Sequence, residues 1–398
     1  MAHIKSFDEL ALEGSAPLLS IEYRDRDENV RGYLVIDRLV GGVAAGGLRI
    51  QPGIDARELA RLARNMTLKQ AVAGIRVGGA KAGLNMSPHA PARDAVLRRF
   101  LAALKPLILH CYSCGPDVNT RMDELDSIAR AIDIPSPKIA VGRSRGLDDR
   151  EFCRRYALLS QTAPGGTVNE LRAATAVAAA VRTLLEQLDA PPAVALQGAG
   201  TVGGATARLL HAAGIDIVAW ADDQQCLVDR RGLNVPELLA HRSGGRLRPN
   251  GSEHSGPPAA ILSQSCSVLV LAAVSDALCV ADVERLRARG MVEAANLAVP
   301  ADAGVALHRG GIPLIPDLIA GVGGSLAVEA LYATAARDGR DVLRHVHARA
   351  TALAQRVLRE SRATSLAPRA VALSWIEETS ATTTATASNA GEVVTTRR

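Results

Sequence analysis

Lys69 is the first residue whose position suggests chemistry as well as packing. From residue 55 onward, apolar side chains recur at helical spacing, which predicts a helix with one buried face. That face contains Leu59, Leu62, Ala63 and Met66. Its next turn passes through Lys69, and burying an ammonium is costly unless the charge is paired. A lone lysine at this position more often extends to solvent at the helix end. A functional role for Lys69 is therefore supported only by the residues near it.

Lys81 follows twelve residues later, directly after Gly78, Gly79 and Ala80. We interpret these three residues as a turn with almost no side chain, which lets another molecule approach the backbone and leaves one amine projecting. Two amines held near each other make one another harder to protonate, and burial adds to that effect. A lysine in such surroundings is suited to acid–base chemistry on a carbonyl or an imine.

Asp117 supplies a carboxylate after a strand-like run over residues 106–114. Because it follows Gly115 and Pro116, we expect its side chain to face a cleft. A single aspartate in such a place is more often a turn or capping residue, and its spacing to Thr120 suits that role. Beside a polarising amine, a carboxylate can instead shuttle the protons that addition of water or ammonia to a carbonyl requires.

A glycine-rich segment lies between an expected strand over 193–197 and an expected helix over 202–213, as the dinucleotide-binding fingerprint requires. Its residues are Gly198, Ala199, Gly200, Thr201, Val202 and Gly203. The first glycine makes the turn, the second lets the backbone touch a pyrophosphate, and the helix N-terminus then faces that group. The alternative is a tight strand-to-helix turn that binds nothing.

Asp222, with Asp223 beside it, ends the next expected strand, about 20 residues after the last glycine of the fingerprint. A carboxylate in that place accepts hydrogen bonds from an adenosine ribose and repels a 2′-phosphate, so NAD is favoured over NADP. Arg230 and Arg231 lie nearby in the sequence and could still meet a phosphate, which keeps NADP possible.

Strand and helix patterns divide the chain into two α/β units. Short strands are expected over 18–23, 31–37 and 42–50, before the Lys69 helix, and residues 134–167 are expected to form an irregular loop. Further on, short apolar strands alternate with helices, which predicts a doubly wound parallel sheet. We expect a substrate-binding and oligomerisation domain over 1–165, a Rossmann-like NAD(P)-binding domain over 166–330, C-terminal helices over 331–377 that pack back on the first domain, and a disordered tail over 378–398.

Length and composition exclude several classes of protein. The chain has 398 residues, 48% of them apolar, and a net charge of +5 with only 3% aromatic residues, so no nucleic-acid-binding pattern is present. No apolar run reaches the roughly 18 residues that a membrane span needs, and no signal peptide is expected. Six scattered cysteines indicate free thiols in the cytoplasm. Cys111 and Cys114 look like half of a zinc or redox motif, but no second pair lies nearby and we expect no metal.

Taken together, these residues resemble the Glu/Leu/Phe/Val amino acid dehydrogenases. The resemblance covers residues 20–360 and its lysine and aspartate segments are highly specific. The matching segments are Gly46-Gly47-Leu48-Arg49, Met66-Thr67-Leu68-Lys69, Gly78-Gly79-Ala80-Lys81, Pro116-Asp117-Val118-Asn119-Thr120, Gly198 to Gly203, Glu293-Ala294-Ala295-Asn296, and Ile315-Pro316-Asp317 through Gly324. The resemblance implies a cofactor domain between an N-terminal substrate domain and C-terminal helices, in a homo-oligomer of two to eight subunits.

The resemblance also implies a role for each matched residue. Lys69, beside Gly47, would hold the substrate α-carboxylate. Lys81 would polarise the carbonyl and activate water, and Asp117 would transfer protons. Thr175 would lie near the nicotinamide amide, and Asn296 near the nicotinamide ribose.

Two departures from the family pattern leave the substrate open. Glutamate enzymes usually carry a lysine before the Gly-Gly-x-Arg segment, where it grips the side-chain carboxylate, whereas this chain has Ala45. The family's Asn-Ala-Gly-Gly appears here as Gly321-Val322-Gly323-Gly324. A small, apolar or specialised biosynthetic amino acid is therefore plausible.

Our leading hypothesis is an NAD(P)-dependent dehydrogenase that acts on the CH–NH2 group of an L-amino acid. Hydride passes from the α-carbon to the nicotinamide, the imine is hydrolysed, and the products are a 2-oxo acid and ammonia. One alternative is a nucleotide-binding regulatory paralogue with little catalysis, which the altered segment at Gly321 motivates. Another is a hydroxy-acid dehydrogenase, but no histidine lies in a setting that suits its base.

Overall fold

Five strands form the sheet of the N-terminal domain, in the order β1-β2-β4-β3-β5. They are β1 (Leu19–Asp25), β2 (Val30–Ile36), β3 (Ala44–Ile50), β4 (Gly78–Asn85) and β5 (Tyr112–Pro116). β2 pairs antiparallel with β1 and β4, whereas β3 pairs parallel with β4 and β5. The computed structural model describes residues 16–249, 253–334 and 336–376, so the tail expected over 378–398 lies outside the described residues.

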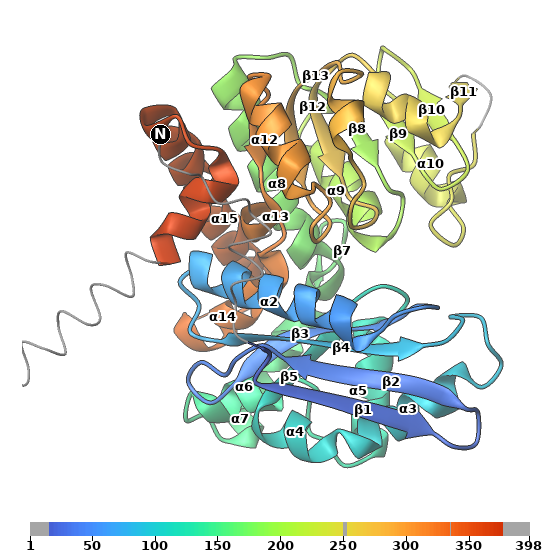
Figure 1. Cartoon of the computed structure of the whole chain (residues 1–398), viewed down its shortest axis with the longest axis vertical. Helices are drawn as coiled ribbons and strands as arrows, with labels where there is room; N and C mark the ends of the chain where they lie inside the picture. The colour runs from blue at the N-terminus through green and yellow to red at the C-terminus, as the bar shows by residue number, and fades with distance from the viewer. Residues whose placement is uncertain (1–15, 250–252, 335, 377–398) are drawn as a thin grey trace, which may run out of the picture.

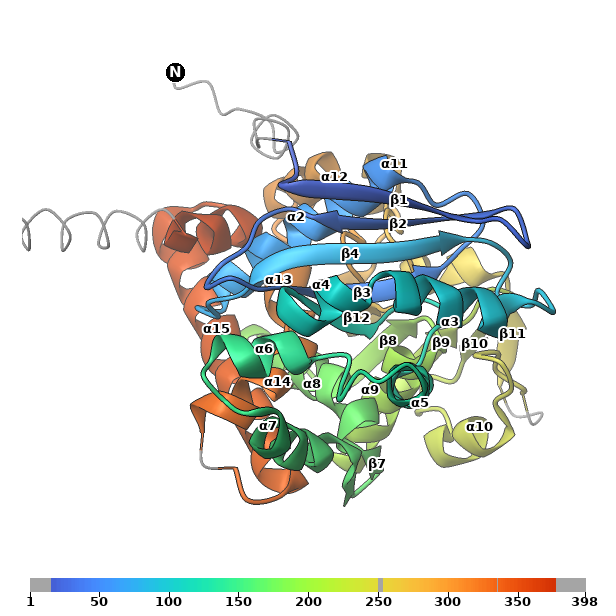
Figure 2. The same ribbon diagram turned by 90° about the horizontal axis from the view of Figure 1, so that it is seen from below.

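Helix α2 (Ala56–Val72) covers the face of this sheet that is turned toward the second domain, as Figure 1 shows. Asp55 begins the helix, because its side chain accepts a hydrogen bond from the Glu58 amide. Leu59 and Leu62 then pack against β2. The opposite face is covered by α3 (Arg93–Ala103) and α4 (Lys105–His110), which Figure 2 shows in front of the sheet. The sheet is therefore buried on both faces.

Three local expectations about this domain are wrong. Residues 105–110 are helical, because Pro106 suits the first turn of a helix and a short apolar run does not distinguish strand from helix. Within the expected loop over 134–167, the structure has α6 (Ile139–Ser144) and α7 (Asp149–Tyr156), the latter capped by Asp148. Gly78 and Gly79 lie inside β4 and do not form a turn.

The second domain has the doubly wound sheet that the sequence predicts, in the order β11-β10-β9-β8-β12-β13-β14. Its parallel strands are β8 (Ala193–Gln197), β9 (Asp216–Ala221), β12 (Cys266–Leu271), β13 (Ala288–Glu293) and β14 (Leu314–Ile315). β10 (Cys226–Val228) and β11 (His254–Gly256) extend it antiparallel at one edge. The helix after β8 is α9 (Thr201–Ala212), and α12 (Ala301–Arg309) precedes β14.

Two long helices join the hydrophobic cores of the domains. α8 (Val168–Leu188) contributes Val168 to the first core and Val181 to the second. α15 (Gly339–Thr364) does the same with Val346 and Val357, so it packs on both domains and not on the first alone (Figure 1). Between them, α14 (Gly323–Ala333) packs into the first core.

The remaining described elements connect these layers. They are α5 (Met122–Ala131), η1 (Ala157–Ser160), β6 (Thr162–Ala163), β7 (Gly166–Thr167), α10 (Val235–His241), η2 (Pro258–Ser263), α11 (Val280–Val283) and α13 (Asp317–Ala320). In the part of the chain that the structure describes, no helix is long and apolar enough to cross a bilayer.

Candidate active site

Lys81 and Asp117 meet on the face of the first sheet that α2 covers. Lys81 Nζ lies 2.8 Å from Asp117 Oδ2, and the same oxygen accepts a 2.8 Å hydrogen bond from Arg49 Nε. All three side chains are largely buried. The three come from β4, from the end of β5 and from β3, strands that run parallel and side by side. The sheet therefore brings together residues that are up to 68 positions apart in the sequence.

Asp117 is free to act because Thr120 takes the capping role in its turn. The Thr120 hydroxyl accepts from the Asp117 amide at 3.0 Å and donates to the Leu48 carbonyl at 2.7 Å. The Asp-x-x-Thr spacing thus reflects capping by the threonine and leaves the carboxylate for Lys81 and Arg49.

Glycines let the site strands approach their neighbours closely. A Cβ atom on Gly47 would lie 2.7 Å from the Pro116 carbonyl oxygen, and one on Gly79 would lie 2.2 Å from the Ala63 carbonyl oxygen in α2. Thr67 then fixes the start of β4, because its hydroxyl accepts from the Gly79 amide at 3.0 Å. The double glycine before Lys81 therefore serves helix-on-strand packing.

Burial and charge set the protonation of the pair. Burial lowers the pKa of Lys81, and the charges of Arg49 and Lys69 lower it further, while Asp117 opposes the shift. Burial alone would raise the pKa of Asp117, but Lys81 and Arg49 outweigh it and hold that pKa far below its usual range. Asp117 is consequently a carboxylate at neutral pH. Lys69 lowers the pKa of Lys81, as the sequence predicts, but burial has the larger effect.

Lys69 is buried and does not extend to solvent, and it reaches across to the second domain. Its Nζ donates a 2.6 Å hydrogen bond to Asn296 Oδ1 and lies 3.5 Å from Asp317 Oδ2. Lys69 is 2% exposed. The family resemblance implies that Lys69 lies at the substrate carboxylate and Asn296 near the nicotinamide ribose, and in the structure the amine contacts the amide oxygen directly.

Asp317 and the residues around it form an ionic cluster between the domains that sequence reasoning missed. Asp317 accepts hydrogen bonds from Asn65 at 2.6 Å and from Arg369 at 2.7 Å. Its backbone amide donates to Glu293 at 3.0 Å. Burial raises the pKa of Glu293 to about 7, with a contribution from the charge of Asp317. Burial acts in the same direction on Asp317, but Lys69 and Arg369 lower its pKa to about 2.

The glycine-rich turn has the geometry that a dinucleotide needs. Gly198 adopts a φ of +102°, and a Cβ on Gly203 would lie 2.0 Å from the Gly198 carbonyl oxygen. Gly200 and Thr201 are exposed at the start of α9, with Val202 behind them. A Cβ on Gly200 would meet nothing within 4 Å, so the space beside its backbone is open to a phosphate. The residues present therefore fit the cofactor that the fingerprint predicts.

Around the expected ribose position, the charged residues differ from expectation in two ways. Asp222 Oδ1 accepts from the Gln224 and Gln225 amides, and its Oδ2 accepts from the Leu247 amide at 2.7 Å, so the carboxylate also holds its own turn. The adjacent Asp223 pairs with Arg246 at 2.9 Å.

Arg230 and Arg231 follow β10, which runs antiparallel to β9. The Asp229 amide donates a hydrogen bond to the Val218 carbonyl in β9. This bond places the two arginines toward the amino end of β9, away from Asp222. The expectation that these arginines could meet a phosphate is therefore wrong, and Arg246 is the arginine beside the acidic pair.

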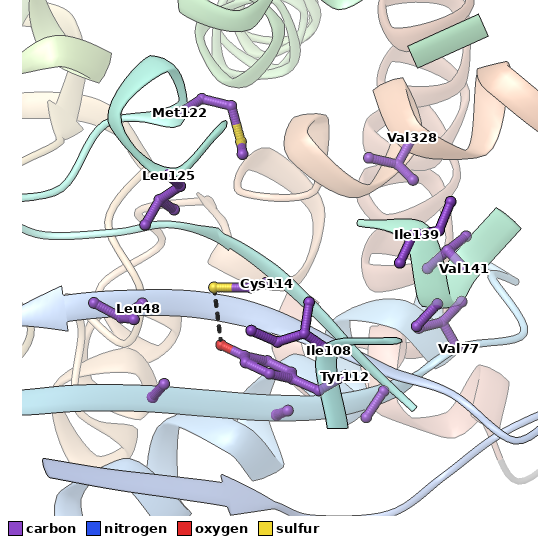
Figure 3. Packing of buried hydrophobic residues seen from close by; sticks show 14 of the residues in the cluster. Leu48, Val77, Ile108, Tyr112, Cys114, Met122, Leu125, Ile139, Val141 and Val328 are labelled. Carbon is purple, nitrogen blue, oxygen red and sulfur yellow. Dashed lines mark hydrogen bonds between the residues drawn. The ribbon is translucent and has the colours of Figure 1, made fainter. Parts of the chain in front are cut away.

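Thr175 and Cys114 are both buried. Thr175 is buried in α8, and its hydroxyl donates to the Leu171 carbonyl at 2.9 Å. Cys114 packs in the core of the first domain, where it accepts a 3.5 Å hydrogen bond from the Tyr112 hydroxyl, as Figure 3 shows. Cys111 follows α4, so the Cys-x-x-Cys segment spans a helix end and a strand.

A buried lysine–aspartate pair in the N-terminal domain, combined with a glycine-rich strand-to-helix turn in a doubly wound sheet, is the combination expected of a nicotinamide-dinucleotide-dependent dehydrogenase. The sequence profile of the Glutamate/Leucine/Phenylalanine/Valine dehydrogenase family matches residues 165–384, and that of the Glu/Leu/Phe/Val dehydrogenase dimerisation domain matches residues 18–134. The chain therefore belongs to this family, whose reaction is the oxidative deamination of an amino acid with NAD(P).

Individual relatives agree with this placement. Glutamate dehydrogenase A2 of Halobacterium salinarum is 29% identical over 297 residues, which cover 71% of this chain and 67% of that protein. The catabolic NAD-specific glutamate dehydrogenase RocG of Bacillus subtilis is 26% identical over 294 residues, with 71% and 66% covered. The Leu-bound hetero-hexameric glutamate dehydrogenase of Thermus thermophilus superposes with a TM-score of 0.75 at 25% identity, covering 93% of this chain and 92% of that one.

Proposed function

We propose that Lys81 and Asp117 are the proton-transferring groups of the amino acid dehydrogenase reaction in this chain. The observation that carries the proposal is their 2.8 Å contact, buried on the face that looks toward the second domain. When bound, the nicotinamide dinucleotide accepts the hydride from the substrate α-carbon. The carboxylate of Asp117 accepts a proton from the substrate amine once Lys81 has lost its own proton, because the charge of Lys81 is a main cause that holds the Asp117 pKa low. The lowered pKa of Lys81 lets its amine take and return the proton of the attacking water at the α-carbon.

We propose that Lys69 holds the substrate α-carboxylate, and that Gly47 contributes to the same subsite, as the family resemblance implies. An ammonium has three donors, and the contacts with Asn296 and Asp317 leave one of them for a ligand. Asn296, which contacts Lys69 directly, then lies near the nicotinamide ribose, and Thr175 near the nicotinamide amide, as the family resemblance implies.

For the cofactor, we propose NAD bound along Gly198, Gly200, Thr201, Val202 and Gly203, with Asp222 facing the ribose. The buried carboxylate of Asp222 disfavours a 2′-phosphate, and Arg246 is occupied by Asp223. The matched relatives include both NAD-specific and NADP-specific enzymes, so the family alone does not decide. Measuring NADH and NADPH affinities before and after Asp223→Ala tests the proposal. If the unmodified protein binds NADPH more tightly than NADH, the proposal is wrong.

We further propose a homo-oligomer assembled through the N-terminal domain, located in the cytoplasm. The name of the family domain at residues 18–134 and the hexameric relative support the assembly. All six cysteines are free thiols, which suits a reducing compartment.

We propose domain boundaries near residues 165 and 330. Light scattering of the purified protein measures the subunit number.

Lys81→Ala tests the catalytic proposal. We expect turnover to fall by at least about 1,000-fold, because a positioned acid–base group contributes that much. NADH binding, measured by fluorescence, should stay within about twofold, because Lys81 lies in the other domain. Lys105→Ala, a change at a surface lysine, is the matched control. Retention of more than a few per cent of the rate would show that Lys81 does not have this role.

A further inference from the structure

Besides the buried contact of Lys69, helix α2 makes an exposed ion pair with the second domain. Arg61 lies on α2, about two turns before Lys69, and its guanidinium meets Asp276 in the segment between β12 and α11. Arg61 Nη2 donates to Asp276 Oδ2 at 2.9 Å, and Nη1 donates to Oδ1 at 3.3 Å, so the pair is bidentate. The helix therefore contacts the second domain at two places about 12 Å apart along its axis.

Glu58 orders the guanidinium of Arg61 on its own helix. Arg61 Nε donates a 3.2 Å hydrogen bond to Glu58 Oε2, and Nη2 donates to Oε1 at 3.3 Å. An exposed ion pair usually contributes little, because holding two flexible side chains in one geometry costs entropy. Less entropy is lost here, since Glu58 already fixes the long side chain and Asp276 has a short one. The pair across the domains is therefore stronger than a lone surface pair.

Asp276 belongs to a turn that is bonded to the chain around Asn296. The Asp276 amide donates to the Leu297 carbonyl at 2.8 Å, and the next residue along each segment repeats this bond at 2.7 Å. The Ser275 hydroxyl donates to the Asn296 carbonyl at 2.9 Å. Residues 275–277 thus bond the three successive carbonyls of residues 296–298, which we call the Asn296 segment. A displacement of Asp276 must therefore move Asn296 as well.

Leu297 adopts a backbone conformation that depends on its contacts. Its φ is +53°, in the left-handed region that a leucine rarely adopts. Its side chain packs against the apolar cluster beneath α2 that contains Leu59 and Leu62. The preceding residue, Asn296, accepts the 2.6 Å hydrogen bond from Lys69. A strained backbone persists only where its surroundings fix it, and several of the contacts that fix this one come from α2.

We propose that Arg61 is a positioning residue for the deamination reaction. Through Asp276 it holds the Asn296 segment against α2, so that the Asn296 amide stays on Lys69. This inference rests on the proposed function, which places the substrate carboxylate on Lys69 and the nicotinamide ribose near Asn296. Loss of the pair raises the fraction of molecules in which Asn296 has left Lys69. Because the pair is exposed, salt weakens the same positioning.

Hydrogen–deuterium exchange of the full-length protein tests the positioning without a substrate. The reporters are the amides of residues 276 and 277, which donate to carbonyls of the Asn296 segment. In Arg61→Met they should exchange about fivefold faster than in the wild type. Asp276→Asn should do the same, because asparagine tolerates the left-handed backbone at this position. The double variant should exchange no faster than either single variant, since both remove one interaction.

Arg154→Met is the matched control for this measurement. Arg154 forms the same kind of bidentate pair with Glu151, three residues earlier, but inside the single helix α7. Exchange at residues 276 and 277 should stay at the wild-type rate in this variant. Wild-type exchange in both Arg61→Met and Asp276→Asn would overturn the proposal.

Kinetics separate this inference from the proposed reaction. The probe is whichever of the standard L-amino acids gives the highest rate with NAD. Arg61→Met should lower kcat/KM about fivefold, mainly through KM, and Arg61→Lys should recover part of the loss. Raising salt from about 20 to about 500 mM should lower kcat/KM of the wild type more than that of Asp276→Asn. The pH profile should not move, because Lys81 and Asp117 lie on other elements.

The possible results assign any failure to one proposal. Faster exchange in Arg61→Met with an unchanged kcat/KM would show a purely structural pair and refute the positioning role. No turnover of any amino acid, with exchange that responds as expected, would refute the proposed roles of Lys81 and Asp117. The hold of Arg61 on the Asn296 segment would then stand by itself.

Discussion

At the scale of single residues, the site is made of charges whose protonation the fold controls. Lys81 and Asp117 share one ion pair and Arg49 completes it, so the carboxylate stays ionised while the amine can lose its proton. Lys138, which directly precedes α6 and is 6% exposed, shows the same control without an ion-pair partner among the described residues. Burial lowers its pKa to about 7, and the charge of Arg172 acts in the same direction.

The same burial predicts a stabilising substitution. The folded-state pKa of Lys138 lies below its unfolded value, so the folded protein binds fewer protons between about pH 7 and 10, and its stability rises with pH there. Lys138→Met removes the buried cation and should raise the free energy of unfolding by about 1–3 kcal/mol at neutral pH. Urea unfolding at pH 7 measures the change. A destabilised variant would indicate that Lys138 has a structural partner.

At the scale of elements, the sequence predicted what local patterns encode. The long helices and the strands of the cofactor domain were found because their apolar periods are regular, and α5 and α8 begin and end where expected. α4 and α6 were missed because a short apolar run and a glycine- and proline-rich stretch have no clear period. Lys138 and Arg369 were missed for another reason: their settings depend on residues far away in the chain.

Gly46 and Gly200 give a matched test of how glycines serve the two domains. A Cβ on Gly46 would lie 1.5 Å from the Ala80 carbonyl oxygen, so Gly46→Ala should prevent β3 from pairing with β4 and yield no folded protein. Gly200→Ala meets nothing within 4 Å and should keep the wild-type melting temperature. Its methyl group fills the approach of the pyrophosphate, so NADH affinity should fall at least about tenfold. Unchanged affinity would contradict the place assigned to the cofactor.

At the scale of the whole molecule, one ionic cluster ties the three parts of the chain together. Asp317 lies after the last strand of the cofactor domain, Asn65 and Lys69 lie on α2 of the first domain, and Arg369 lies in the helical segment after α15. Arg369 also donates to Asn65 at 3.1 Å. Lys69, the amine proposed to bind substrate, therefore belongs to a cluster that contacts both domains and the C-terminal segment.

Arg369→Met tests whether this cluster holds the C-terminal segment in place. Removing the guanidinium leaves Asp317 and Glu293 with less counter-charge in a buried site. We therefore expect the free energy of unfolding to fall by about 3–5 kcal/mol. Cleavage by protease near the C-terminus should become faster. KM should also rise, because Lys69 then carries more of the pairing with Asp317. Arg344→Met, which breaks an exposed pair with Asp341, should stay within about 1 kcal/mol. Equal effects of the two substitutions would show that the cluster does not join the domains.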